Sequence, residues 1–190
     1  MTWMSKIIRS AGSAFPVTSM LVQLQSDLDA EKIAERITKL EDPISFLHED
    51  IPDLSKQIYD KTRATDKQNL EFERDFYTKN SKPLAILDAK GFIEGVHALG
   101  KGNEYVGGFW LRDPTYVMYM CQLAEDSDQM ERLLDRLESA QAGDWLTAAK
   151  LQETLKLPTP VINAAFQIYE ARGYGICSKE VGSCSYLAKA

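Results

Sequence analysis

Four polar side chains near the C-terminus are the residues in this sequence best spaced to recognise another molecule. They are Thr159, Asn163, Gln167 and Glu170. Residues three or four apart share one face of a helix. Asn and Gln side chains can pair with adenine in the major groove of DNA. We therefore expect this helix face to recognise either a protein or DNA, although a solvated polar surface would show the same spacing.

Three lysines near this helix are candidate phosphate contacts, namely Lys150, Lys156 and Lys179. Nucleic-acid binding depends on concentrated positive charge, because basic side chains neutralise phosphates. Residues 144–190 carry five basic and four acidic side chains, and the whole chain has a net charge of −6. This balance weakens the case for DNA and favours a protein partner.

The sequence has no residue set spaced for a known catalytic or metal-binding motif. His48 and His97 are the two histidines, and His48-Glu49-Asp50 matches no metal-ligand spacing. No Ser/His/Asp set has motif spacing. A group of glycines also follows no phosphate-binding pattern and fits a bent hairpin better: Gly100, Gly102, Gly107 and Gly108. We predict a non-enzymatic protein with no cofactor and no metal.

The three cysteines are predicted to be thiols rather than disulfide partners. Cys177 and Cys184 flank the turn of a predicted hairpin, and Cys121 lies far from both in the sequence. The two hairpin registers that we consider place Cys177 opposite Leu187 or Ala188. Neither register brings the sulfurs face to face, as a disulfide requires.

The segment that carries the polar face has the order helix, turn, helix, glycine, hairpin. Thr147 is the expected N-cap of the first helix, and Thr159-Pro160 is expected to cap the second. Gly173 stands where a helix end favours positive φ. The apolar positions of the second helix have spacing i, i+3, i+4 and i+7, and they are Ile162, Ala165, Phe166 and Tyr169.

This order resembles the winged helix-turn-helix superfamily. The phrase Ile168-Tyr169-Glu170-Ala171-Arg172-Gly173-Tyr174 is similar to the junction between second helix and wing in that superfamily. The resemblance covers residues 144–190, and it implies a small domain that contacts DNA or a protein through its second helix.

A second copy is indicated earlier in the chain. Ile86-Leu87-Asp88-Ala89-Lys90-Gly91-Phe92 repeats the same order of residue types, and a predicted strand, turn and strand follow it. A tandem winged-helix protein would show this pattern, and so would chance, because these residue types are common.

The remaining segments are predicted to be mostly helical. Short helices are expected at 44–48 and 52–59, a loop at 64–69, and a helix that begins at Asp113-Pro114. An apolar stripe in residues 18–40 indicates a helix that is either core or a dimer contact, with Leu21, Leu24, Leu28, Ile33, Ile37 and Leu40.

The predicted fold class is therefore α+β, mostly α. The predicted organisation is a helical region at 1–63, a candidate first winged-helix-like unit at 64–112, connecting helices at 113–143 and a winged-helix domain at 144–190. The sequence contains no apolar run long enough to cross a membrane and no signal-peptide pattern, and its cysteine count is odd. We expect a cytoplasmic adaptor or accessory protein that binds a protein, either another chain or a second copy of itself, with a DNA-binding transcriptional regulator as the alternative.

Overall fold

The computed structural model describes residues 44–45, 47–97, 105–124, 126–180 and 183–189. The predicted helix in residues 18–40 lies outside these ranges. The described chain is mixed α and β with more helix than strand, so the predicted fold class is confirmed.

The first half of the described chain forms a three-stranded antiparallel sheet with three helices. Its elements are α4 (Ile51–Thr65), β1 (Asn69–Leu70), α5 (Arg74–Lys79), α6 (Ser81–Ala89), β2 (Ile93–His97) and β3 (Tyr105–Leu111). The strand order is β1-β3-β2. We call this the first unit.

The second half repeats that arrangement after an intervening helix, α7 (Pro114–Leu123). The second unit consists of α8 (Ser127–Glu138), β4 (Trp145–Thr147), α9 (Ala148–Leu155), α10 (Thr159–Ala171), β5 (Gly175–Glu180) and β6 (Ser183–Ala188). Its strand order is β4-β6-β5, which is the order of the first sheet with each strand replaced by its counterpart. Both units thus have the order helix, strand, helix, helix, strand, strand.

The last helix before the hairpin, α6 in the first unit and α10 in the second, ends in the same way in both units. Gly91 and Gly173 have φ values of 76° and 83°, which glycine adopts at little cost. The amide of Gly91 donates to Asp88 O and that of Phe92 to Leu87 O, at 2.9 Å each. The counterparts 82 positions later, Gly173 to Glu170 and Tyr174 to Tyr169, repeat these bonds at 2.8 and 3.1 Å. Each helix therefore turns into its hairpin through the same C-terminal motif.

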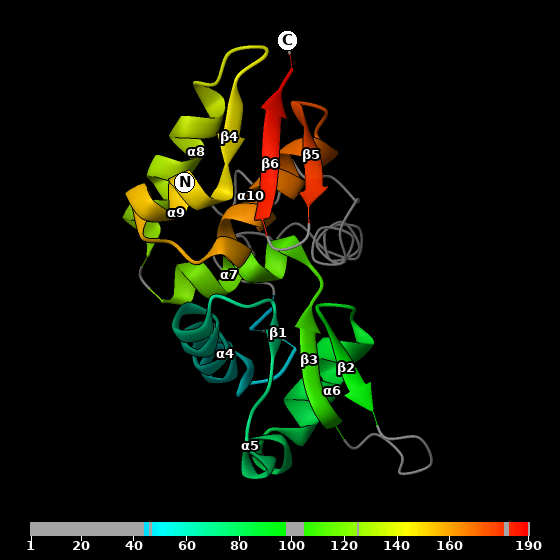
Figure 1. Ribbon diagram of the computed structural model, residues 1–190. Helices are drawn as coiled ribbons and strands as arrows, with labels where there is room; N and C mark the ends of the chain where they lie inside the picture. The colour runs from blue at the N-terminus through cyan, green and yellow to red at the C-terminus, as the bar shows by residue number, and fades with distance from the viewer. Residues whose placement is uncertain (1–43, 46, 98–104, 125, 181–182, 190) are drawn as a thin grey trace, which may run out of the picture.

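Helix α7 lies between the two sheets and joins the units (Figure 1). It begins as expected from Asp113-Pro114, because Asp113 Oδ1 accepts the amides of Thr115 at 2.6 Å and Tyr116 at 3.0 Å. Residues 114–121 are all buried, and the helix packs on α4 of the first unit and α10 of the second. An apolar helix covered on every side is a core element.

Several local predictions are wrong. The described residues 44–45 and 47–48 are not helical, and the helix begins at Ile51, because Pro52 favours the first turn. That helix continues to Thr65, into the predicted loop. Pro158 is the N-cap residue of α10 in place of Thr159.

The hairpin register also differs from both predicted registers. Glu180 pairs with Ser183, which places Cys177 opposite Tyr186 and Cys184 opposite Lys179. All three cysteines lie in described residues, and none forms a disulfide.

No described helix has both the length and the apolar character that a membrane crossing requires.

Candidate interaction surfaces

The predicted recognition face lies mostly against the protein itself. Asn163 and Gln167 of α10 border a very small cavity together with Pro114 and Val117 of α7. Both polar side chains are half-buried. Asn163 Oδ1 is buried and has no hydrogen-bond partner among the described residues. Helix α7 thus occupies the side of α10 that a DNA groove or a partner would need to approach.

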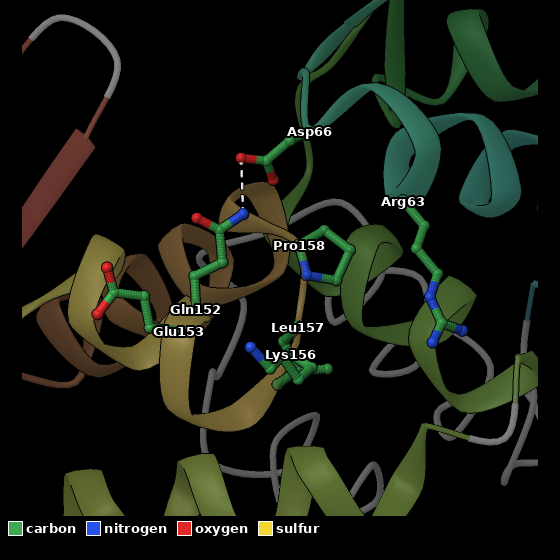
Figure 2. Close-up of a pocket in the computed structure, with 7 residues that line it drawn as sticks. All are labelled: Arg63, Asp66, Gln152, Glu153, Lys156, Leu157 and Pro158. Carbon is green, nitrogen blue, oxygen red and sulfur yellow. Dashed lines mark hydrogen bonds between the residues drawn. The ribbon is translucent and has the colours of Figure 1, made fainter.

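Thr159 is held by Asp66, the residue that ends α4 in the first unit. Asp66 Oδ1 accepts the Thr159 amide at 2.6 Å, and its Oδ2 accepts the Thr159 hydroxyl and Gln152 Nε2 at 2.8 Å each. Figure 2 shows the Asp66–Gln152 bond. A carboxylate at this position satisfies an unpaired amide and complements the positive end of the helix dipole.

Lys156 borders an open pocket of about 340 Å³ beside this contact (Figure 2). Its lining comes from the end of α4, from α9 and from the α9–α10 turn, namely Arg63, Asp66, Gln152, Glu153, Lys156, Leu157 and Pro158. The lining thus includes two cationic side chains, Arg63 and Lys156, and two carboxylates, Asp66 and Glu153. This mixed charge is a poor match for a phosphate, which is favoured by cations without nearby anions.

The other predicted contact residues are spread over separate elements. Glu170 Oε1 accepts the amide of Cys177 at 2.8 Å and so fastens β5 to α10. Lys150 is exposed on α9, and Lys179 lies in β5. The three lysines thus lie on separate elements, with Lys150 in α9, Lys156 just after it and Lys179 in β5, and the recognition role of all these residues stays a prediction.

The outer face of the second sheet is an apolar surface that sequence reasoning missed. Leu187 of β6 pairs with Trp145 of β4 on one side and with Ile176 of β5 on the other. Directly opposed residues point to the same side of a sheet. Trp145 is 61% exposed and Ile176 is 47% exposed, while Tyr174, just before β5, is 56% exposed. We call Trp145, Leu187 and Ile176 the outer sheet face, while the Tyr174 ring lies 5.9 Å from the ring of Tyr169 in α10.

The opposite side of the same strands belongs to the core. Leu146, Tyr186 and Cys177 form the next row, in which Tyr186 is 1% exposed and Cys177 is 8% exposed. Apolar residues thus occupy both sides of β4 and β5. In the sequence, apolar residues follow one another in these strands instead of alternating with polar residues. This pattern indicates that both sides of the sheet carry apolar surface.

The first sheet also exposes a tryptophan, but charged groups cover part of it. Trp110 of β3 is 40% exposed, and the Arg112 guanidinium lies 5.7 Å from the centre of its ring. Arg112 also forms an ion pair with Glu94 of β2. Trp145 has no corresponding cation within its described surroundings.

A buried polar cluster joins the two units beside α7. Tyr59 of α4 donates from its hydroxyl to Asp126 Oδ2 at 2.7 Å and contacts Cys121 Sγ at 3.6 Å. Arg63 Nη1 lies 3.6 Å from the same Asp126 oxygen. Burial raises the pKa of the Tyr59 hydroxyl far above its usual range, and burial raises the pKa of the Cys121 thiol to about 12. A thiol that stays protonated is a poor nucleophile. The geometry therefore indicates that this cluster serves to hold the two units together.

The described residues contain no group of three or more His, Cys, Asp or Glu side chains placed to hold a metal ion. His48 Nδ1 accepts the amide of Asp50 at 3.2 Å, and His97 lies in β2. Comparison of the chain with protein-family models, curated proteins and solved structures finds no match.

Proposed function

We propose that this protein is a non-enzymatic adaptor or accessory protein of the cytoplasm, built from two winged-helix units and acting through protein contacts. The observation that carries the proposal is the outer sheet face, where Trp145, Leu187 and Ile176 form one row across the three strands. Clustered exposed aromatic and aliphatic side chains typically mark protein-binding surfaces, because their burial releases water. Tryptophan and tyrosine are also frequent among the residues that dominate binding energy.

The covered position of α10 supports a protein partner over the alternative, a DNA-binding regulator. A winged helix that reads DNA inserts its second helix into the major groove. Here α7 packs against α10, and Asp66 places a carboxylate at the N-terminus of α10. An anion at that position repels a DNA phosphate.

A DNA-binding titration of the purified full chain tests the alternative. Non-specific binding is strongest at low salt, so the mixture is held at about 50 mM salt. We expect no shift of mixed-sequence duplex DNA. A salt-dependent shift that is lost in Lys150→Ser or Lys156→Ser would favour the DNA-binding regulator.

Affinity purification of the full chain from its native host tests the protein contact. The variant Trp145→Ser/Ile176→Ser should lose a protein that co-purifies with the unchanged chain, while Lys150→Ser, which alters an exposed residue on α9, should retain it. The circular dichroism spectra of the variants check that folding is intact. Equal recovery from all three proteins would reject the outer sheet face as the binding surface.

A further inference from the structure

The two units differ in what covers the last helix before the hairpin. An offset of 82 residues aligns α6 with α10, as the repeated hydrogen bonds at Gly91 and Gly173 require. On α10, Ala164 is 3% exposed and Ile168 is completely buried, and α7 packs against the helix. The equivalent positions on α6 are Lys82, which is exposed, and Ile86, which is half-buried.

Helix α6 therefore has an open outer side where its counterpart has a helix. It packs on β2 and α5, and no described helix covers the side that carries Ser81, Lys82, Ala85 and Ala89. We call these four exposed residues the α6 face. Ser81, Lys82 and Ala85 are the counterparts of Asn163, Ala164 and Gln167, which border the contact with α7.

The chemistry of the α6 face indicates what fits on it. The short side chains of Ser81, Ala85 and Ala89 allow another helix to approach closely, since the distance between packed helices depends on the side chains at the contact. Lys82 is exposed on this face, and two further exposed lysines, Lys79 and Lys90, come just before and just after α6 in the sequence. A partner with acidic side chains beside an apolar stripe would complement both features.

We infer that the α6 face is a docking site for an acidic amphipathic helix of a partner protein. The apolar stripe of that helix lies over Ala85 and Ile86, and its carboxylates meet Lys79, Lys82 and Lys90. The contact repeats in trans the packing that α7 makes on α10 within the chain. This inference rests on the proposed protein-binding function but uses a different surface. DNA is less favoured here, because three lysines neutralise few phosphates.

Site-specific photo-crosslinking tests the inference. The photoreactive residue p-benzoylphenylalanine replaces Ala85 in the full chain, expressed in the native host, and mass spectrometry maps the peptide that becomes attached. The control places the same residue at Ala171, an exposed alanine of α10. We expect Ala85 to attach to an acidic amphipathic segment of another protein, and Ala171 to attach to it at least about tenfold less.

Charge reversal supplies the second measurement. Lys82→Glu should reduce the yield of this cross-link at least about tenfold, since it places like charges opposite each other. Lys150→Glu makes the same change on an exposed lysine of α9 and should leave the yield unchanged. Equal yields in the two variants would overturn the inference.

The other outcomes also decide against it. Attachment of Ala85 to nucleic acid, to residues 1–43 of the same chain, to a second copy, or to nothing would reject the acidic partner helix. If a protein is lost from Trp145→Ser/Ile176→Ser while Ala85 attaches to nothing, the proposed function stands and the α6 docking site fails.

Discussion

Tyr59 connects three elements through one hydroxyl group. Its hydroxyl reaches Asp126, the N-cap residue of α8, and Cys121 near the end of α7, while its ring is fully buried with α4. Asp126 is only 7% exposed. A buried carboxylate depends on hydrogen-bond donors to replace water. We therefore expect the Tyr59 hydroxyl to contribute more to the free energy of unfolding than a hydroxyl that bonds a neutral group.

We predict that Tyr59→Phe lowers the free energy of unfolding by about 1–3 kcal/mol, since Asp126 loses its short hydrogen bond. Tyr116→Phe is the matched control, because Tyr116 is equally buried but pairs with the neutral Ser55 hydroxyl at 3.0 Å. Ser55 can turn to a carbonyl of its own helix, so the control should lose about 1 kcal/mol or less. Urea unfolding of both variants measures the difference, and equal losses would contradict the special role of Asp126.

The raised pKa of the Cys121 thiol predicts that the free energy of unfolding falls at alkaline pH. Its pKa is raised to about 12 in the folded chain by burial, against about 8.5 for an ordinary thiol. Between these values the folded chain keeps the proton and the unfolded chain loses it. This contribution is therefore fully present below about pH 8.5 and is lost as the pH rises, by up to about 1.4 kcal/mol per unit.

We expect Cys121→Ala to flatten the dependence of unfolding free energy on pH between about pH 8.5 and 9.5. Cys184→Ala, which alters a half-buried thiol of β6, should retain the part of the slope that comes from Cys121. Urea unfolding at three pH values gives the slopes. Identical slopes in Cys121→Ala and the unchanged chain would refute this assignment.

At the scale of elements, the contact between α4 and α10 replaces the usual cap of a helix. Neither Pro158 nor Thr159 caps α10 with its own side chain, and the carboxylate comes from Asp66, 93 positions before Thr159. Asp66 itself has a φ of 54°, a left-handed conformation that Asp and Asn tolerate better than most residues.

Asp66→Gly should lower the free energy of unfolding by about 0.5–2 kcal/mol, because glycine retains the backbone conformation but removes the cap. Asp66→Asn keeps one acceptor oxygen and should cost less. Hydrogen exchange of the Thr159 amide is the direct readout, and it should be fastest in the glycine variant. Unchanged exchange in both variants would show that the carboxylate does not hold this end of α10.

At the scale of the whole molecule, α7 makes the two units depend on each other. Met118 and Met120 are fully buried in this helix, which packs on α4 and α10. Neither unit can lose α7 without exposing apolar surface. We therefore predict that the described part of the chain unfolds as one cooperative body rather than as two domains.

Two tryptophan variants test this cooperativity. One retains Trp110 in the first sheet and the other retains Trp145 in the second, with Phe at the remaining tryptophans. Met120→Ala, introduced into each, should lower the stability reported by both probes by the same amount, about 2–5 kcal/mol. A loss seen by one probe alone would show that the units unfold separately.

The sequence determined the local features of this fold. The pair Asp113-Pro114 begins α7 because the side chain of Asp and the ring of Pro suit a helix start by themselves. Gly91 and Gly173 end their helices because glycine adopts positive φ without steric cost. These signals depend on near neighbours, so the α+β class and the repeated helix, glycine and hairpin were readable without tertiary structure.

Tertiary structure decided which surfaces are open. A polar face such as Asn163 and Gln167 has the same spacing whether water or another helix lies over it, and here α7 covers it. The cap on α10 comes from Asp66 because folding brings distant residues together. The outer row of Trp145, Leu187 and Ile176 depends on strand register, in which a shift of one residue exchanges the two faces of a strand. Local spacing specifies the elements, and long-range packing specifies which of their sides remain available for binding.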